Sequence, residues 1–221
     1  MGRAFRRFSG SDAVEDFARG PFLHRKSRTS FQIIRTGDRL VFRSWQQDAD
    51  GRPFLELRLP VDFILGSGHR ARVYIYRARG GELFQFPLAW YSEERSWGMA
   101  PGYDRPDHDG VMRRIRRECL FCHSAYADLP RGANAAWAPQ VFLPELPKGI
   151  GCQRCHGPGS AHVDAAVERL PDEDVRRRIV NPSRLERTLR DAVCEQCHLL
   201  PTRHPPQVPG PRLARPGECR D

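Results

Sequence analysis

Hydrophobic and polar residues alternate along much of the first half of the chain, between residues 31 and 92. This period of two is typical of β-strands that bury one face. Turn-forming residues separate the runs at 36–38, 48–51 and 79–81, and residues 61–65 lead into a tight turn at 66–68. The pattern predicts an antiparallel β-meander with strands near residues 31–35, 40–45, 54–59, 72–76 and 83–90.

The second half of the chain has a different pattern, in which short helical segments lie between turns. We expect helices over residues 110–118, from Ser160 to about residue 170, over 172–178, and from about residue 183 to the last cysteine pair. Ser11 is a suitable N-cap for a further short helix at 11–15, and residues 93–110 are expected to be a loop.

These patterns predict an α+β fold in three segments. Residues 1–110 form a β-rich N-terminal region, and residues 111–200 form a loop-rich region with short helices. Residues 201–221 contain six prolines and are expected to be an extended linker.

The composition limits the size of the apolar core. Only 39% of the 221 residues are hydrophobic, and the mean hydropathy is −0.61. The length allows one domain or two small ones. No apolar run approaches the roughly 18–20 residues that span a bilayer. A bound apolar group could supply the volume that a chain of this composition lacks.

Six of the seven cysteines lie in three copies of the pattern C-x-x-C-H, at residues 119–123, 152–156 and 194–198. This pattern is the attachment signature of a c-type haem. Two thiols three positions apart can each add to one vinyl group of a haem, and the following histidine supplies the proximal nitrogen ligand of the iron. We therefore predict three covalently bound haem c groups. The thioether cysteines are Cys119, Cys122, Cys152, Cys155, Cys194 and Cys197, and the proximal ligands are His123, His156 and His198.

Other uses of paired cysteines fit the sequence less well. A single C-x-x-C pair is more often a zinc site or a redox thiol pair. Zinc ribbons use two such pairs for each metal ion, and three pairs do not divide evenly. A disulfide framework needs no histidine after each pair. Cys219 is the odd cysteine, and it is interpreted as a free thiol, an intermolecular bridge or part of a longer sequence.

Five further histidines are candidates for the distal iron position: His24, His69, His108, His162 and His204. His108 lies shortly before the first motif. His162 is expected on the first turn of a helix, six residues after His156, so it would reach a neighbouring iron rather than the same one. For His24, a distal ligand and an ordinary surface histidine are equally good interpretations. His69 in its loop and His204 in the proline-rich segment are weaker candidates.

The formal net charge is +9, and almost all of the basic residues are arginines. A nucleic-acid partner has to be considered for so basic a chain. However, each haem carries two propionates, and three haems would offset much of the excess. Arginine pairs well with carboxylates, although a general preference for Arg over Lys would explain the composition equally well. We therefore expect no nucleic-acid partner and no transmembrane segment.

Haem c is attached outside the bacterial cytoplasm, so a periplasmic or other extracytoplasmic location in the cell envelope is expected. The first ten residues, M-G-R-A-F-R-R-F-S-G, carry charge but lack the apolar segment of a secretory signal. Either a signal has been removed or the chain begins inside a longer protein.

Several runs resemble a known family. They are E-C-L-F-C-H-S-A-Y, C-Q-R-C-H-G-P-G-S-A-H-V, I-V-N-P-S-R-L and D-A-V-C-E-Q-C-H-L, with V-D-F-I-L-G-S-G and W-G-M-A-P-G-Y-D-R-P upstream. They are similar to bacterial multihaem cytochromes related to the tetrahaem cytochrome of nitrifying bacteria, which are often fused to C-terminal tetratricopeptide repeats. The resemblance covers roughly residues 30–200.

The resemblance implies an envelope electron-transfer protein with bis-histidine or mixed-spin haems and redox partner proteins. It also implies that His162, at the histidine of the family's G-P-G-x-x-H run, is a distal ligand. Two departures matter. The chain lacks the further C-x-x-C-H that family members carry before the segment matching M-G-R-A-F, and the tetratricopeptide repeats would lie in a longer parent chain. A fourth haem is then missing from this sequence.

Three functions compete at this point. An electron-transfer module predicts six-coordinate, low-spin haems, and five non-motif histidines are enough to cap three irons. A haem-dependent oxidoreductase of small nitrogen compounds predicts at least one open, high-spin haem beside acid–base residues. A zinc or disulfide interaction module predicts no haem. The electron-transfer module is the preferred interpretation.

Overall fold

The computed structural model describes residues 4–125, 130 and 138–198. Backbone contacts divide the chain into two units, Met1–Ile150 and Gly151–Asp221. This division lies after residue 150, and the functional division predicted after residues 110 and 200 stays a prediction. The first C-x-x-C-H motif therefore belongs to the N-terminal unit, and the other two belong to the C-terminal unit. The linker predicted at 201–221 lies outside the described residues.

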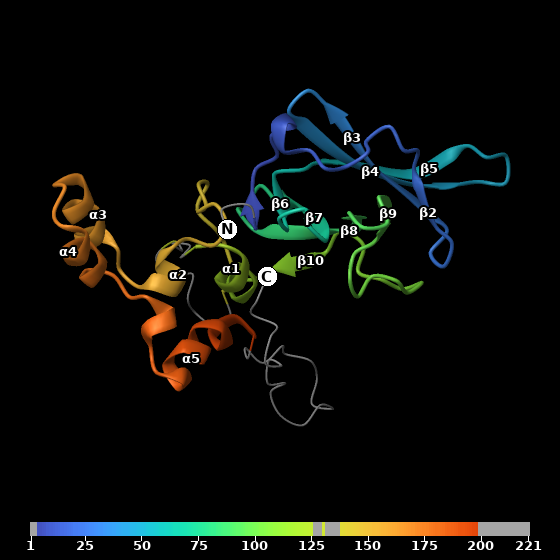
Figure 1. Ribbon diagram of the computed structural model, residues 1–221. Coiled ribbons are helices and arrows are strands. Elements are labelled where there is room, and N and C mark those ends of the chain that lie inside the picture. Colours follow the sequence, from blue (N-terminus) through green and yellow to red (C-terminus); the bar gives the residue numbers. More distant parts are fainter. Residues whose placement is uncertain (1–3, 126–129, 131–137, 199–221) are drawn as a thin grey trace. The chain divides into compact units, whose positions relative to one another are not determined.

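The N-terminal unit contains two antiparallel sheets (Figure 1). The four-stranded sheet is a meander with the strand order β2-β3-β4-β5. Its strands are β2 (Phe22–His24), β3 (Thr29–Thr36), β4 (Arg39–Gln47) and β5 (Pro53–Pro60). Each strand pairs with the next one in sequence, as the alternating pattern and the short turns predicted.

The six-stranded sheet has the order β1-β6-β7-β8-β10, and β9 pairs with β8. Its strands are β1 (Phe5–Arg6), β6 (Phe63–Leu65), β7 (Ala71–Arg77), β8 (Leu83–Tyr91), β9 (Ser96–Met99) and β10 (Arg113–Ile115). The pairing of β7 with β8 is irregular between Val73 and Ile75. This irregularity lies opposite Pro87, whose missing N–H would interrupt a regular ladder.

The main hydrophobic core lies between the two sheets. Phe42 of β4 stacks on Phe86 of β8 with 4.2 Å between the ring centroids, and both side chains are fully buried. The same cluster contains Ile33 from the four-stranded sheet and Tyr74 and Trp90 from the six-stranded sheet. Burial of large aromatic side chains on both inner faces holds the sheets together.

The opposite face of the six-stranded sheet carries a second, smaller cluster. Phe63, Ile75 and Leu83 alternate with residues of the main core along their strands and point to this other face. Helix α1 (Arg117–His123) covers them with Leu120, which is 1% exposed. Three neighbouring strands with apolar residues on both faces therefore fix the position of α1.

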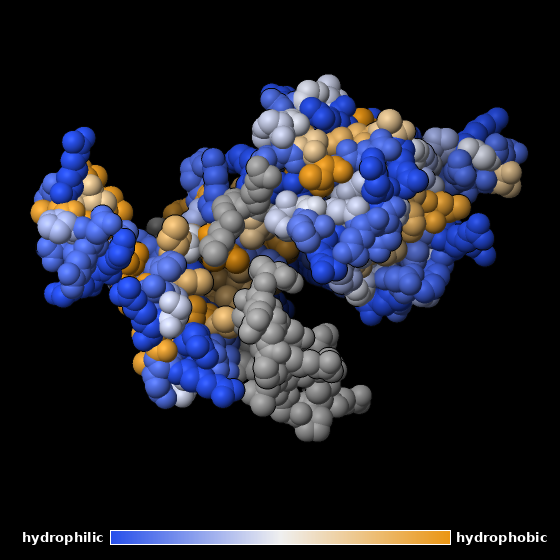
Figure 2. Space-filling view, viewed as in Figure 1, coloured by the Kyte–Doolittle hydropathy of each residue, from blue (hydrophilic) through white to orange (hydrophobic). Residues whose placement is uncertain are grey.

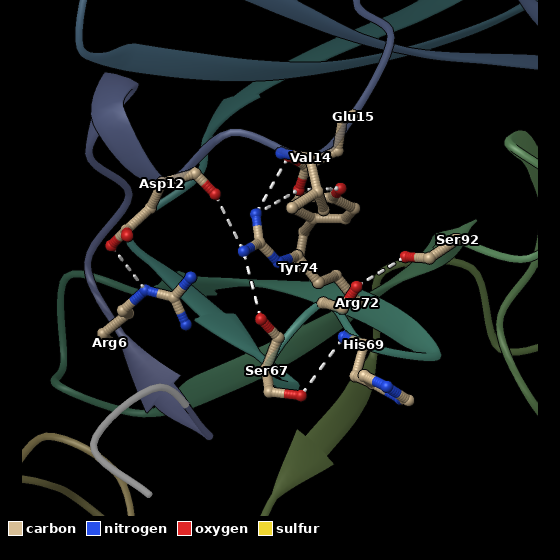
Figure 3. A network of polar contacts seen from close by, with 10 residues as sticks. Arg6, Asp12, Val14, Glu15, Ser67, His69, Arg72, Tyr74 and Ser92 are labelled. Atoms are coloured by element: carbon tan, nitrogen blue, oxygen red, sulfur yellow. Dashed lines mark hydrogen bonds and ion pairs between the residues drawn. The ribbon is translucent and has the colours of Figure 1, made fainter.

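A buried ion pair connects the N-terminal segment to β7 (Figure 3). Arg72 Nη1 donates to both carboxylate oxygens of Glu15 at 3.0 and 3.1 Å. Arg72 Nη2 donates to the main-chain oxygens of Asp12 at 2.9 Å and Ser67 at 3.2 Å. Tyr74 Oη donates to Glu15 Oε1 at 2.8 Å, and burial together with the Glu15 charge raises the pKa of Tyr74 well above its ordinary value. The network connects three segments of the chain: residues 12–15, the turn at Ser67 and strand β7.

The first residues of the N-terminal segment are attached to the sheet as well. Gly66 N donates to the carbonyl oxygen of Ala4 at 2.7 Å, and Arg6 Nε donates to Asp12 Oδ2 at 3.1 Å. Gly66 has a φ of +111°, and a Cβ there would lie 2.4 Å from the carbonyl oxygen of Ala71. Only glycine fits this turn.

The C-terminal unit is helical and has little core of its own. Its helices are α2 (Gln153–His156), α3 (Ser160–Val167), α4 (Asp172–Arg177), the 3₁₀ helix η2 (Pro182–Arg184) and α5 (Arg187–His198). Arg154 and Ala165 are buried, whereas Val163, Val167 and Leu189 are exposed. Figure 2 shows the resulting hydrophobic patches among charged surface. Across the described residues, no helix combines the length and hydrophobicity needed to cross a bilayer.

The α+β fold class is confirmed, but two predicted helices are corrected. The helix predicted over residues 110–118 is strand β10 followed by α1, because Arg113–Ile115 pairs with the edge of β8 and buries Ile115 in the second cluster. The helix predicted at 11–15 is a single 3₁₀ turn, η1 (Gly10–Asp12). The chain leaves that turn extended, and Glu15 then meets Arg72.

Three short strands were missed, because short segments carry almost no periodic signal. Strands β1 and β2 have two and three residues. Strand β9, with four residues, lies in the predicted loop at 93–110. Each pairs with a longer neighbouring strand, so tertiary pairing defines it rather than its own sequence.

Removal of the Glu15 charge should strongly destabilise the N-terminal unit. In Glu15→Gln, the Arg72 cation would remain buried without a counterion, and we expect the free energy of unfolding to fall by about 3–5 kcal/mol. Urea unfolding of the purified protein, followed by tryptophan fluorescence, measures this change.

Glu56→Gln is the matched control. Glu56 accepts two hydrogen bonds from Arg43, but solvent reaches this pair, so its loss should cost far less. Equal destabilisation by the two substitutions would contradict the role assigned to the buried pair.

Candidate functional site

The first C-x-x-C-H motif forms the last five residues of α1. Leu120, between its cysteines, inserts into the second cluster of the N-terminal unit, and Cys119 packs beside it. Arg117 N donates to Gln140 Oε1 at 2.8 Å, and the fully buried Ser124 donates through Oγ to the carbonyl oxygen of Pro147 at 2.6 Å. Contacts at both ends therefore fix the motif to the sheet.

His123 ends α1 and retains solvent-exposed surface. Protein atoms around its ring nevertheless disfavour the charged form by desolvation, and this lowers the pKa of His123. The side chain is therefore held toward its neutral state, which is the state that can offer a nitrogen lone pair.

The second motif forms its own helical turn, α2. The main-chain N–H of His156 donates to the carbonyl oxygen of Cys152 at 2.9 Å. One helical turn places residues at i and i+3 on the same face, so Cys152 and Cys155 are neighbours there. Both carry free thiols. Gly157 ends the turn with a φ of +71°.

His156 is held by a reciprocal contact with Val180. Its Nδ1 lies 2.8 Å from the carbonyl oxygen of Val180, and Val180 N donates to the His156 carbonyl oxygen at 3.3 Å. A carbonyl oxygen only accepts hydrogen bonds, so Nδ1 carries the proton. Nε2 of the neutral ring therefore keeps its lone pair, which is the arrangement found in metal-binding histidines.

His162, on the first turn of α3, has the same arrangement. Its Nδ1 donates to the carbonyl oxygen of Val175 at 2.8 Å, near the C-terminus of α4. The Nε2 lone pair of this ring is also left for a ligand. Two carbonyl oxygens five residues apart, at Val175 and Val180, thus orient both imidazoles.

The third motif ends α5 and contacts the second. Gln196, between Cys194 and Cys197, donates through Nε2 to the carbonyl oxygens of Arg154 at 2.9 Å and Val193 at 2.7 Å. Arg154 lies between the two cysteines of the second motif. The structure therefore brings the second and third motifs together. The side chain of His198 lies outside the described residues.

His24 and His108 lie together in the N-terminal unit, with 5.5 Å between their ring centroids. Gly110 N donates to His108 Nδ1 at 3.1 Å, so the neutral His108 ring donates from Nε2 to Ser27 Oγ at 3.3 Å. Ser27 Oγ also contacts His24 Nδ1 at 2.8 Å, and His24 Nε2 contacts Asp104 Oδ1 at 3.1 Å. All four ring nitrogens have partners. Iron ligation by either histidine would require one of these contacts to break, and it stays a prediction.

The remaining candidates are less informative. His69 is exposed, and its main-chain N–H donates to Ser67 Oγ at 3.2 Å. His204 and Cys219 lie outside the described residues. In the described part of the chain, no three His, Cys, Asp or Glu side chains converge on a possible metal site. A c-type haem does not need such a group, because two thioethers hold its ring.

The sequence identified the cysteines and histidines but not the groups that position them. The carbonyl oxygens of Val175 and Val180 carry no sequence signal, since every residue has one. Ser27 and Gln196 are polar residues at ordinary positions. Pro158 was the one sequence signal for the Gln196 contact. It lies four residues after Arg154 and has no N–H, so it cannot donate a helical hydrogen bond to the Arg154 carbonyl oxygen.

Comparison with known protein families, with characterised proteins and with solved structures gives no match for this chain. The function is therefore argued from the sequence motifs and the geometry.

The His24–His108 pair should make the N-terminal unit sensitive to acid. Burial, and then the positive charge of His24, lower the pKa of His108, while Arg105 also lowers it and Asp107 and Asp109 oppose the shift. The unfolded chain, with a histidine pKa of about 6.5, then binds the proton more readily than the folded chain. The contribution of His108 to stability is complete above about pH 6.5 and is lost as the pH falls toward the folded-state pKa.

In His108→Asn, the fall in the free energy of unfolding between about pH 7 and about pH 5.5 should be smaller than in the parent protein. Urea titrations at the two pH values measure it. His69→Asn, at an exposed loop histidine, is the control and should retain the parent dependence. An unchanged dependence in His108→Asn would contradict this assignment.

Proposed function

We propose that this chain is part of a multihaem c-type cytochrome, which transfers electrons through three covalently attached haems. The haem supplies a redox iron when it is bound, and the chain supplies its attachment and axial groups. The single observation that carries the proposal is the second motif. There, two free thiols one helical turn apart accompany an imidazole whose Nδ1 proton is bound by the Val180 carbonyl oxygen.

The donor set fits haem c. Thioether formation needs two reduced cysteines at this spacing, and Cys152 and Cys155 are such a pair. The proximal position needs an imidazole with a lone pair at Nε2, and the Val180 carbonyl oxygen, by binding the Nδ1 proton of His156, leaves Nε2 of the neutral ring for that role. His123 after the first pair is likewise held toward its neutral form. We assign the proximal positions to His123, His156 and His198 and the thioethers to the six motif cysteines.

His162 is the best-supported distal ligand. Its Nδ1 is bound to the Val175 carbonyl oxygen, and its Nε2 has a lone pair. His162 and His156 are held by the same short segment of chain, so both rings are preoriented before a haem is bound. Preorientation lowers the entropic cost of ligation.

A second candidate function is a haem-dependent oxidoreductase of small nitrogen compounds. It is favoured by one observation, that both ring nitrogens of His24 and of His108 already have partners. Fewer histidines are then left to cap three irons, and an uncapped iron is an open coordination site. High-spin haem in the complete parent chain would favour this second function.

The location and partners follow from the first proposal. Haem c attachment places the chain in the periplasm or elsewhere in the bacterial cell envelope. Redox proteins would be its electron donors and acceptors, and tetratricopeptide repeats would follow it in a longer parent chain. The basic residues would pair with haem propionates.

Loss of one cysteine pair should remove one haem. Expressed with a haem-attachment system, the protein should carry three covalent haems, and Cys152→Ala with Cys155→Ala should carry two. Pyridine haemochrome absorbance per protein and the mass of the denatured chain measure the number. Cys219→Ala, outside the motifs, is the control and should retain three. A parent protein without covalent haem would exclude this function.

Replacement of His162 should open one iron. In His162→Ala, one of the three haems should gain a high-spin absorption band and bind cyanide or imidazole, with its potential shifted by the lost ligand. His69→Ala, at an exposed loop histidine, should leave the spectrum unchanged. A spectrum of His162→Ala identical to that of the parent would remove His162 from the ligand set.

A further inference from the structure

The second and third C-x-x-C-H motifs meet through equivalent positions. Arg154 is the second residue between the cysteines of its motif, and Gln196 is the second residue between the cysteines of the other. The side-chain amide of Gln196 donates to the main-chain oxygen of Arg154 at 2.9 Å. Within the C-terminal unit, this hydrogen bond joins two segments that are 42 residues apart in the chain.

The Arg154 carbonyl oxygen needs a donor from outside its own helix. In a continuous helix the partner would be the N–H four residues later, but that residue is Pro158. The N–H of Gly157, the residue before Pro158, donates to the Gln153 carbonyl oxygen instead. Arg154 is only 7% exposed, so a carbonyl oxygen without a partner would be costly here. Gln196 supplies a donor to this carbonyl oxygen from α5.

The position of the Gln196 side chain is well defined. Its Nε2 has two protons, and it has two acceptors, the carbonyl oxygens of Arg154 and Val193. Val193 lies on the same helix as Gln196, so this second bond orients the amide toward α2. A partly buried side chain with both donors used has one preferred conformation and can hold two segments in register.

We propose that Gln196 is a positioning residue that couples the second and third haem-attachment turns, so that the redox centres they carry titrate as an interacting pair. The inference rests on the proposed function and goes beyond it, because three independent haems would serve electron transfer equally well. The physical reason is electrostatic. A change of charge at one turn acts on the other when both are held in contact.

The test measures whether one attachment site responds to the other. It uses the full chain with the first pair removed by Cys119→Ala and Cys122→Ala, so that only the second and third motifs carry haem. The midpoint potential of the third haem is measured with the second pair present and with that pair removed by Cys152→Ala and Cys155→Ala. The difference between the two potentials is the coupling.

With Gln196 present, we expect removal of the second haem to change the redox equilibrium of the third roughly tenfold, about 59 mV for a one-electron couple. In Gln196→Met, which has a similar volume but no donor, the difference should fall to a small fraction of that value. Gln153→Met is the matched control, because Gln153 is the exposed glutamine of the second motif. It should retain the full coupling.

The outcomes separate the two proposals. Absence of covalent haem at either motif would exclude the proposed function. Normal haem content with no coupling in the parent background, or with unchanged coupling in Gln196→Met, would overturn the role of Gln196. If Gln196→Met lowers haem content, Gln196→Glu repeats the test with a side chain of the same shape that accepts where glutamine donates. Full coupling in Gln196→Glu would likewise overturn the proposal.

Discussion

The ion pair between Arg72 and Glu15 is the interaction on which the N-terminal unit depends most. Both side chains are completely withdrawn from solvent, and the guanidinium also binds the main chain of Asp12 and Ser67. Such a pair contributes little net energy, because desolvation offsets most of the attraction, but it permits only one arrangement of the segments that meet there. The segment it fixes includes β1, whose Phe5 packs in the same cluster as Leu120. The ion pair thereby helps to support α1 and the first attachment motif.

The C-terminal unit is stabilised in a different way. Few of its residues are buried, and Val163, Val167, Val180 and Leu189 expose apolar surface. Three hydrogen bonds from imidazole and amide groups to main-chain oxygens connect its separate segments. A group that binds the folded unit but not the unfolded chain would add to its stability. The proposed haems would supply the apolar volume, and the main-chain oxygens would ensure that the ligands face them. The two units thus present attachment motifs by different means, one on a packed sheet and the other on a set of linked turns.

The sequence predicted the elements that have strong periodicity and failed where tertiary pairing decides. Strands β3 and β4 were found because their alternation follows from burial of one face between the two sheets. Strand β8 is buried on both faces, and its long apolar run between turn residues was sufficient to predict it. Residues 113–115 were assigned to a helix, although the free edge of β8 and the apolar cluster under Ile115 favour a strand. The cysteine pairs were identified from the sequence alone, because their spacing is visible without a structure. The hydrogen bonds that orient the histidines were invisible, because their acceptors are carbonyl oxygens that any residue could supply.

Histidine identity alone therefore does not separate the candidate ligands, whereas the hydrogen-bond partners of each ring do. Val175 and Val180 offer pure acceptors, so His162 and His156 must donate from Nδ1 and keep an Nε2 lone pair. His108 instead accepts a hydrogen bond from Gly110 N and donates one to Ser27 Oγ. The Ser27 hydroxyl then donates to His24 Nδ1, and His24 Nε2 donates to Asp104. In that chain each lone pair is already used. The same residue type is thus oriented for the proposed ligation in one unit and bridges polar groups in the other. The difference lies in the group beside each ring. A carbonyl oxygen can only accept a hydrogen bond, whereas the Ser27 hydroxyl can both donate and accept one.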